Sequence, residues 1–346
     1  MKTVLFFSSV KDVKLFGLTG FYVEDIKVLE NVGYKVKSTN KISDFFKIWN
    51  YDIAFLYFYK ISFIPALLAR LAFKKVIYTG GIDELCPGII AKRRDRIKFQ
   101  LLFKLNYLLS TFCNIVSKTD MENAKLCLNN FPKMSNAKLS YFPHSIDTVG
   151  YMEAEGTSKE NIITTICWMA SVGNVKRKGV DRTLAFFKKV LERNSEYKLY
   201  IIGTQGAGSD YLKELISEYG IEKSVFFTGE ISEEQKISYL DRSKFYLQLS
   251  TYEGFGIAVV EAMMLRNYIF HTAVGGLKDT VGERGYVVED RRDYFDSLEV
   301  FFTISNNYND YCDLLEENRK FIIDQFSREA RINYFRKLII DDDVKR

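Results

Sequence analysis

The chain has 346 residues, of which 47% are hydrophobic and 27% charged, a composition that excludes a disordered chain and suits two globular domains. Its formal net charge of +5 is milder than that of a typical nucleic-acid-binding domain, so we expect no nucleic-acid partner. Five cysteines without a CxxC pair indicate free thiols in a reducing, cytoplasmic compartment, and with only two histidines we expect no bound metal and no cofactor.

The first half of the chain alternates short apolar runs with helical patterns, which is typical of parallel α/β folds. The expected strands are Thr3–Phe7, Tyr34–Lys37, Ile53–Tyr57, Lys75–Tyr78, Asn114–Ser117 and Leu139–Phe142, and the expected helices lie near Tyr22–Asn31, Ile64–Phe73, Arg93–Leu109 and Met121–Asn129. The N-terminal run predicts a first buried strand rather than a signal peptide, and the longest apolar stretch, Ile61–Phe73, is too short to span a bilayer.

The helical segment Lys92–Leu109 is basic at its start and carries a broad apolar face. That face consists of Ile97, Phe99, Leu101, Leu102, Phe103, Leu105, Leu108 and Leu109. A basic amphipathic helix can lie on an anionic membrane surface, which would add a peripheral location on the inner face of the cell membrane to a cytoplasmic protein. A core helix with a solvated basic end explains the same pattern, and the sequence alone slightly favours it.

The second half repeats the alternation more regularly. Strands are expected at Ile162–Cys167, Leu199–Ile202, Val225–Thr228, Phe245–Leu249, Tyr268–His271 and Tyr286–Val288, and helices at Arg182–Arg193, at Tyr211–Tyr219, after Ser232 and from Ile257. Ser232 and Gln235 have the spacing of a capping box. The last segment, Glu316–Ile340, predicts one or two helices.

These elements predict two Rossmann-like, doubly wound domains that face a central cleft. The polar stretch Glu153–Asn161 is the expected linker, which gives domains 1–152 and 153–320, with residues 321–346 as a helical segment that packs back on the N-terminal domain. Ligands of such sheets bind outside the carboxyl ends of the strands, so the chemistry is expected there.

The segment Ser250–Glu261 (STYEGFGIAVVE) follows a strand and opens a helix. Its two glycines allow close backbone approach, and the free N–H groups of a helix start suit a phosphate. Glu253 can accept hydrogen bonds from sugar hydroxyls, while the deeper Glu261 needs a partner such as a ribose diol. An acidic N-cap followed by a solvated helix glutamate fits the pattern equally well.

Several motifs in order resemble the large retaining glycosyltransferase family 4, which has the GT-B fold. They are Glu253 and Glu261 within YEGFGIAVVEAM, Lys178 within KRKGVDRTL, the strand Val225–Gly229 (VFFTG), the loop Gly275–Val281 (GGLKDTV) and the interdomain segment Phe142–Thr148 (FPHSIDT). The resemblance is strong over residues 140–290 and only architectural before that. Domain 1–152 would accordingly bind the acceptor and domain 153–320 the nucleotide-sugar.

The resemblance implies a role for each matching residue. Glu253 would contact the donor sugar, Glu261 the ribose, and Lys178 the pyrophosphate, with Glu253 and Lys178 acting in catalysis. The main-chain N–H groups of Gly254, Phe255, Gly256 and Ile257 would lie near the phosphates, and Gly229 near the base. An arginine that the family places shortly before the lysine is missing, so Lys176 or Arg177 would supply the second cation. A surface lysine before a helix is the alternative for Lys178.

The N-terminal half offers weaker candidates. Gly17, in the loop after the first strand, resembles the family's glycine that approaches the diphosphate from the opposite domain. Asp83 ends a strand where many family members have a histidine and an aspartate, and it is a candidate for the acceptor site or a helix N-cap. His144, in the interdomain segment, is a candidate contact to donor or acceptor, although a packing role suits a lone histidine better.

The resemblance predicts a retaining glycosyltransferase of the hexosyltransferase type. Its donor would be a UDP- or GDP-linked sugar, and its acceptor a glycan, lipid-linked or polysaccharide, in surface polysaccharide biosynthesis. A non-catalytic GT-B protein that binds nucleotide-sugar or glycan is the first alternative. An NAD-dependent oxidoreductase is the second, but the loop after the first strand lacks the G-x-G-x-x-G spacing that a dinucleotide requires. The sequence does not define an oligomeric state.

Overall fold

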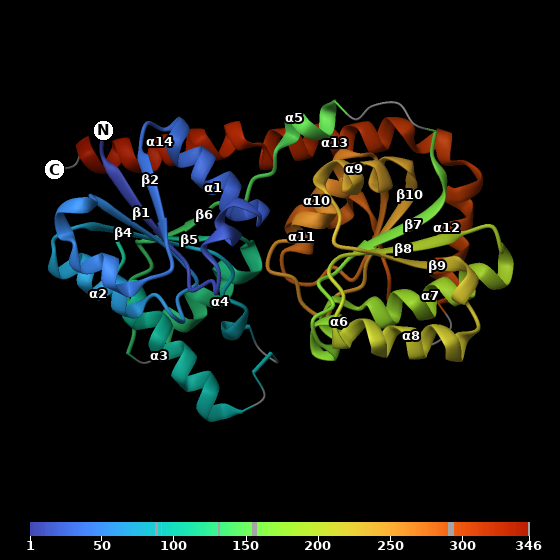
Figure 1. Ribbon diagram of the computed structural model, residues 1–346, viewed down its shortest axis with the longest axis horizontal. Helices are drawn as coiled ribbons and strands as arrows, with labels where there is room; N and C mark the ends of the chain where they lie inside the picture. The colour runs from blue at the N-terminus through green and yellow to red at the C-terminus, as the bar shows by residue number, and fades with distance from the viewer. Residues whose placement is uncertain (87–88, 91, 131, 154–157, 290–293, 345–346) are drawn as a thin grey trace. The chain divides into compact units, whose positions relative to one another are not determined.

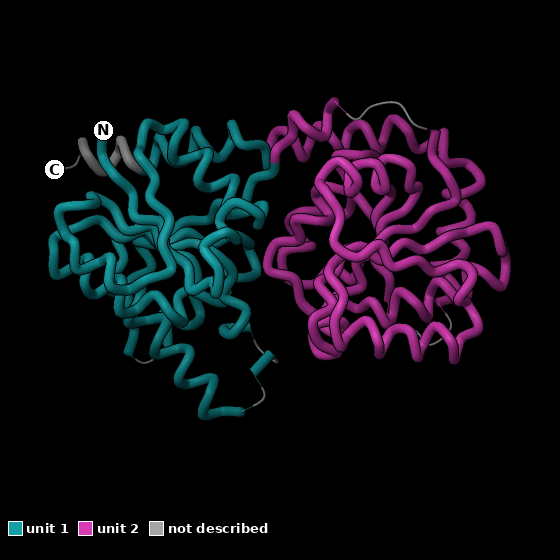
Figure 2. The backbone as a smooth tube through the Cα atoms, in the orientation of Figure 1, with its two compact units in different colours: residues 1–146, 326–346 teal, residues 147–325 magenta. Residues whose placement is uncertain are grey.

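The chain forms two compact units, each built on a parallel sheet (Figures 1 and 2). This computed structural model describes residues 1–86, 89–90, 92–130, 132–153, 158–289 and 294–344. Unit 1 comprises residues 1–146 and 326–346, and unit 2 comprises residues 147–325. The predicted domain boundaries were 152/153 and 320/321. The chain passes from one unit to the other at 146/147 and 325/326, six and five residues from these predictions. Part of the predicted linker, residues 154–157, lies outside the described residues.

Unit 1 contains a six-stranded sheet in the order β2-β1-β3-β4-β5-β6, with every pair parallel. The strands are β1 (Thr3–Phe7), β2 (Lys35–Thr39), β3 (Ile53–Tyr57), β4 (Lys75–Thr79), β5 (Phe112–Ile115) and β6 (Leu139–Tyr141). The helices are α1 (Gly20–Asn31), α2 (Phe63–Leu71), α3 (Arg93–Leu109), α4 (Lys118–Asn129) and α14 (Arg328–Val344), with 3-10 turns η1 (Val13–Gly17), η2 (Ile42–Phe46), η3 (Ile48–Asn50) and η4 (Asp83–Leu85). The central strands β1, β3 and β4 are nearly continuous apolar runs, because both faces of the sheet are covered there.

Two hydrophobic clusters cover the two faces of the unit 1 sheet. One joins the sheet to η2, α2, α3 and α4, and the other joins it to α1 and α14. Figure 1 shows α1 and α14 on one side of the sheet, with α2 and α3 on the other. The C-terminal helix α14 therefore completes unit 1, as the GT-B prediction required. Nearby, Ile146 pairs with Ser327 and its N–H donates to the Phe326 carbonyl at 2.9 Å, so the chain leaves and re-enters unit 1 at adjacent points.

Unit 2 contains a second six-stranded parallel sheet, in the order β12-β11-β10-β7-β8-β9. The strands are β7 (Glu160–Ile166), β8 (Lys198–Ile202), β9 (Val225–Gly229), β10 (Ser243–Gln248), β11 (Tyr268–His271) and β12 (Tyr286–Val287). The helices are α5 (Thr148–Met152), α6 (Val172–Lys178), α7 (Val180–Arg193), α8 (Ala207–Tyr219), α9 (Glu233–Arg242), α10 (Ile257–Met264), α11 (Leu277–Thr280), α12 (Phe295–Asn306) and α13 (Cys312–Phe326), with turns η5 (Glu222–Ser224), η6 (Gly282–Arg284) and η7 (Tyr308–Tyr311).

The two sheets confirm the predicted GT-B architecture, with strand positions close to those expected. Helices α5, α6, α11 and α12 were not predicted, and the C-terminal segment forms two helices, α13 and α14, of which α13 begins at Cys312 rather than at Glu316. The capping box of α9 is present, because the Gln235 N–H bonds Ser232 Oγ and the Ser232 N–H bonds Gln235 Oε1. Among the described residues, no helix has the length and apolar character needed to cross a bilayer.

Candidate functional site

The strand order of unit 2 reverses between β7 and β10. From β7 the chain builds outward through β8 and β9 on one side, and β10 to β12 lie on the other. The loops that follow β7 and β10, starting at Cys167 and Leu249, therefore leave the same edge of the sheet and diverge. Ligands of open α/β sheets bind at such a switch point, so this edge is the first place to look for a site.

An ion pair between two predicted site residues lies at this edge. Lys178 Nζ is 2.9 Å from Glu253 Oε1 and 2.7 Å from Oε2. The side chains are 20% and 10% exposed, respectively. The Ser250 hydroxyl donates to Glu253 Oε2 at 3.3 Å, which adds a second partner for the carboxylate. The pair thus joins residues 75 positions apart and keeps one side of each group accessible.

Gly179 determines where Lys178 lies. Lys178 is the last residue of α6, and Gly179 takes the left-handed conformation (φ +69°) before α7 begins. A Cβ on Gly179 would lie 1.8 Å from the Leu249 carbonyl oxygen, so only glycine allows this approach to the end of β10. The Thr251 N–H also donates to the Arg177 carbonyl at 2.8 Å. The end of α6 is therefore fastened to the loop that carries Glu253.

The glycine loop after β11 supports the backbone of Glu253 from the other side. The Gly276 N–H donates to the Glu253 carbonyl at 2.7 Å. A Cβ on Gly275 would lie 2.1 Å from that same oxygen, and one on Gly276 would lie 2.5 Å from the Gly254 carbonyl oxygen. The GGLKDTV motif thus has a local physical role, which is to let one backbone segment pass directly against another.

The predicted phosphate-binding turn begins helix α10. Gly256 is its N-cap in the left-handed conformation (φ +92°), and Ile257 is its first helical residue. Phe255 is buried, at 4% exposure, and anchors the turn. The first N–H groups of a helix have no intrahelical acceptor, and they attract anions. Gly254 to Ile257 therefore connect Glu253 to the first turn of α10, and their contact with phosphates stays a prediction.

Glu261 lies one turn into α10 and forms a separate network. Lys236 Nζ, on α9, lies 2.9 Å from Glu261 Oε1 and 2.8 Å from Glu233 Oε1. The Tyr151 hydroxyl donates to Glu233 Oε1 at 2.6 Å. Burial opposes the charge of Lys236, but Glu261 and Glu233 outweigh it and raise the lysine pKa. Lys236 is therefore a charged partner for Glu261. Sequence reasoning missed it, because the contact joins two helices 25 residues apart.

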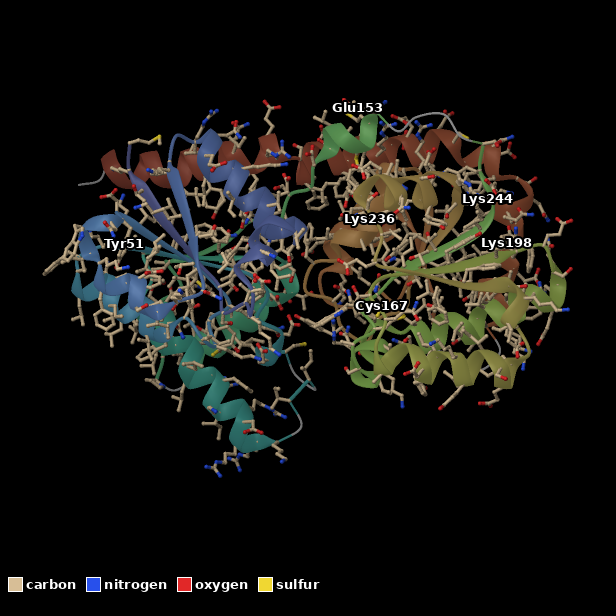
Figure 3. All side chains as sticks on the ribbon, viewed as in Figure 1. Tyr51, Glu153, Cys167, Lys198, Lys236 and Lys244 are labelled. Atoms are coloured by element: carbon tan, nitrogen blue, oxygen red, sulfur yellow. The ribbon has the colours of Figure 1, made fainter. Side chains whose placement is uncertain are left out.

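The structure separates the two candidates for a second cation. Arg177 Nη1 donates to the Tyr252 carbonyl at 3.3 Å, beside Glu253, whereas Lys176 Nζ lies 5.2 Å from the centre of the Tyr211 ring on α8. Burial raises the pKa of Cys167, at the end of β7, to about 11, and the charges of Lys178 and Arg177 oppose that rise. Figure 3 labels Cys167 and Lys236, which both belong to unit 2. Arg177 is therefore the cation that shares an environment with the ion pair.

The structure adds two features to the interpretation from sequence. The stretch Val172–Lys178, for which no helix was predicted, is helix α6, so Lys178 lies at the C-terminal end of one helix and precedes α7. Glu261, expected to need a partner such as a ribose diol, has a protein partner in Lys236.

The remaining candidates occupy different places. Gly229 ends β9 in the left-handed conformation (φ +72°), and its carbonyl accepts from the Gly203 N–H at 3.2 Å at the same edge of the unit 2 sheet. Gly17 ends η1 and Asp83 begins η4, both in unit 1. His144, also in unit 1, is buried with its ring 5.5 Å from Phe21. Burial and the charge of Arg331 lower the pKa of His144 to about 3, so its ring is neutral near pH 7.

No group of three or more His, Cys, Asp or Glu side chains suited to a metal ion occurs in the part of the chain that the structure describes. The five cysteines are free thiols.

Comparisons with known proteins point to one class of enzyme. Residues 159–303 match the family model "Glycosyl transferases group 1". The GDP-mannose:cellobiosyl-diphosphopolyprenol alpha-mannosyltransferase of Xanthomonas oryzae is 36% identical over 87 residues, which are 25% of this chain and 23% of that protein. The poly(ribitol-phosphate) alpha-N-acetylglucosaminyltransferase of Staphylococcus aureus is 24% identical over 220 residues, which are 63% of this chain and 39% of that protein. The matched segments thus span well under half of these relatives.

Solved structures share the fold of this protein over the whole length of the chain. Anabaena Alr3699/HepE in complex with UDP and glucose has a TM-score of 0.74 at 12% identity and covers 99% of this chain and 100% of its own. The sucrose-phosphate synthase of Thermosynechococcus elongatus has a TM-score of 0.75 at 15% identity, with 100% of both chains covered. At such identities the likeness shows the fold alone. Residues 159–303 thus match a glycosyl transferases group 1 domain within a GT-B fold, and segments of the chain are homologous to known glycosyltransferases.

Proposed function

We propose that the protein is a retaining glycosyltransferase of family 4 that moves a sugar from a UDP- or GDP-linked donor to a glycan acceptor. The observation that carries the proposal is the Lys178–Glu253 ion pair beside the glycine-rich start of α10, at the switch point of the unit 2 sheet. A cation next to a helix N-terminus suits a diphosphate, and a carboxylate next to both suits the hydroxyls of the attached sugar.

In this proposal each residue acts on a different part of the donor. Lys178 and Arg177 neutralise the charge that builds on the leaving diphosphate, together with the first N–H groups of α10. Glu253 accepts hydrogen bonds from the sugar, and Ser250 and Lys178 hold its carboxylate in place. Glu261 accepts from the ribose hydroxyls, with Lys236 orienting it. The diphosphate and Glu253 then share Lys178.

Retention follows from the family resemblance. The acceptor hydroxyl attacks from the face that the diphosphate leaves, and the departing phosphate oxygen takes its proton. This step needs no carboxylate base. Unit 1 would bind the acceptor, with Asp83 and His144 as candidate contacts, and its Gly17 would approach the diphosphate of the donor. The names of the relatives, which transfer mannose to a lipid-linked glycan or N-acetylglucosamine to poly(ribitol-phosphate), support a glycan acceptor of polysaccharide synthesis.

The test measures release of nucleoside diphosphate from UDP- and GDP-sugars, together with thermal shifts by UDP and GDP alone. A nucleotide at 100 times its dissociation constant should stabilise the protein by ~2.7 kcal/mol. No shift with either nucleotide and no release would overturn the proposal. A shift without release, with glycan acceptors supplied, would instead identify a non-catalytic binding protein.

Variants of the two carboxylates test the division of roles. Glu261→Ala and Lys236→Met should weaken binding of the free nucleotide, whereas Glu253→Ala should reduce sugar transfer with a smaller effect on the nucleotide. The control is Glu214→Ala, an exposed glutamate on α8 that should behave as the parent. Equal effects of Glu253→Ala and Glu261→Ala on nucleotide affinity would contradict the assigned roles.

A further inference from the structure

The strand order of unit 1 also reverses, between β1 and β3. From β1 the chain builds to β2 on one side, and β3 to β6 lie on the other. The loops that follow β1 and β3, starting at Ser8 and Phe58, therefore leave the same edge of the sheet and diverge. Open α/β sheets bind ligands at such a switch point, so unit 1 has a candidate binding edge of its own.

Phe58 has a strained backbone at this switch point. Its φ is +61°, in the left-handed region, which a bulky aromatic residue rarely adopts. The Phe58 N–H donates to the Thr79 carbonyl at 3.2 Å, and the Ser62 hydroxyl donates to the Phe58 carbonyl at 2.9 Å. The fold thus fixes a costly conformation that determines where this side chain points, and strain of this kind clusters at functional sites.

The Phe58 ring is part of an accessible aromatic surface. Phe58 is 36% exposed, and Phe21, the second residue of α1, is partly buried. The centres of these two rings are 6.3 Å apart, with the ring planes at 83°. The Phe58 ring also lies against Gly80, where a Cβ would approach it to 3.1 Å. We term Phe21 and Phe58 the aromatic platform.

The side chains that support the platform carry no net charge. The Phe21 ring is 5.5 Å from the rings of both His144 and Tyr57. His144 is neutral near pH 7, and burial raises the pKa of Tyr57, so its hydroxyl stays protonated. That hydroxyl donates to Asp25, whose charge Arg331 compensates. A phosphate would therefore find no unpaired cation among these contacts, whereas an uncharged ligand does not need one.

An aromatic surface in neutral surroundings suits a sugar ring. The face of an aromatic ring carries partial negative charge, and the C–H groups on one face of a pyranose carry partial positive charge. Stacking the two also removes apolar area from water. An acyclic alditol phosphate has neither a rigid C–H face nor a neutral charge, so the platform favours a neutral, cyclic sugar.

We propose that the aromatic platform receives a neutral pyranose ring of the acceptor glycan, with Phe58 stacking on its C–H face and Phe21 beside it. This inference rests on the proposed transfer function, because it names the part of the acceptor that unit 1 binds. Sugar binding at the platform needs no donor, however. It can therefore fail while nucleotide binding and nucleoside diphosphate release stand, and it can persist when they fail.

The experiment is saturation-transfer NMR on the full chain without nucleotide, with the aromatic protons of the protein irradiated. The probes are cellobiose, maltose and methyl α-mannopyranoside, and ribitol 5-phosphate is the acyclic, anionic comparison. At least one neutral sugar should bind, with saturation concentrated on the C–H protons of one ring face. Ribitol 5-phosphate should receive no such saturation.

Two variants of Phe58 test the stacking itself. Phe58→Leu should weaken sugar binding about tenfold, because leucine is apolar but has no aromatic face. Phe58→Tyr should bind within about twofold of the parent, since it keeps the ring. Binding that depends on an aromatic side chain at this position separates stacking from simple apolar contact.

Phe73→Leu is the matched control. Phe73 is also a phenylalanine with a left-handed backbone (φ +58°), and it is 96% exposed. It follows α2 and precedes β4, so it lies at the amino edge of the same sheet, away from the switch point. This variant should leave sugar binding within about twofold of the parent. Both leucine variants should melt near the parental temperature, because they exchange one large apolar side chain for another.

Three results would overturn the proposal. One is that none of the three neutral sugars binds, and another is that Phe58→Leu binds sugar as tightly as Phe73→Leu. The third is that ribitol 5-phosphate receives saturation that Phe58→Leu abolishes, which would assign the platform to an acyclic acceptor.

Discussion

Each unit buries an ion pair between residues far apart in sequence, and the two pairs differ in what surrounds them. In unit 1, Arg331 is 0% exposed, bonds both Asp25 oxygens and donates to the Pro143 carbonyl, while the Tyr57 hydroxyl donates to Asp25. In unit 2, Lys178 and Glu253 retain partial exposure at the carboxyl edge of the sheet. A closed, fully bonded pair fastens a helix to its unit. A half-open pair can exchange partners with a ligand.

The largest expected effect is on the closed pair. Arg331→Met should destabilise unit 1 by about 3–5 kcal/mol, because it leaves the Asp25 carboxylate buried without its cation. Denaturant unfolding followed by Trp49 fluorescence, in a Trp168→Phe background, measures unit 1 specifically. The control is Arg328→Met, whose partner Glu24 forms a more exposed pair and whose loss should cost much less. Similar losses in both variants would contradict the distinction.

The open pair should respond in activity rather than in stability. Lys178→Gln should reduce the turnover of sugar transfer by about 10²–10³-fold, roughly 2.7–4 kcal/mol of transition-state stabilisation. Its melting temperature should change less than that of Arg331→Met. Lys176→Gln is the control, because Lys176 lies over the Tyr211 ring and should lose little activity. A large loss with Lys176→Gln would mean that the second cation has been misidentified.

A glycine comparison tests the placement of Lys178. Gly179→Ala should cost about 2–5 kcal/mol, from the left-handed backbone and from the overlap with the Leu249 carbonyl. Gly220→Ala has the same backbone conformation (φ +68°) with open space around its Cβ, so only the backbone cost of about 1–2 kcal/mol applies. Unfolding midpoints measure the difference. Equal midpoints would show that the approach of α6 to β10 is not tight.

The last expected effect is a pH dependence beside the closed pair. The folded pKa of His144 is about 3, below its unfolded value of about 6.5, so the unfolded state binds the extra proton between these values. The contribution of His144 to the free energy of unfolding is therefore fully present above pH 6.5. It falls as the pH drops, by at most about 1.4 kcal/mol per pH unit. His144→Gln should flatten this slope in Trp49-monitored unfolding. An unchanged slope would contradict a buried neutral histidine.

The sequence predicted those features that depend on neighbours along the chain. Continuous apolar runs located the strands, and the spacing of Ser232 and Gln235 located a capping box that forms both its bonds. Helix α6 was missed because Gly173, Asn174 and two valines give it low helical propensity over only two turns. Its Ser171 N-cap, which accepts from the Asn174 N–H at 3.2 Å, and its terminal Gly179 were the available signals.

Contacts across the fold could not be predicted in this way. The Lys236–Glu261 bond depends on how α9 packs beside α10, which no local pattern encodes. The burial of Lys104 and Asn106 on α3 could not be predicted either, since it depends on hydrogen bonds to the carbonyls of Asn130 and Tyr59. The motif residues around Glu253 were found because their roles are local to one turn. The contacts from distant elements that hold these residues in place were not predicted.

The division of unit 1 into two stretches of chain has a consequence for synthesis on the ribosome. Unit 2 is continuous, so all of its strands have emerged before α14 exists. Asp25 is made 306 residues ahead of Arg331, and Glu24 is made 304 residues ahead of Arg328. During elongation the first 146 residues thus carry two acidic side chains without their arginine partners. Domains usually mature from the N-terminus onward, but here we expect the later unit to become native first and the earlier one to close last.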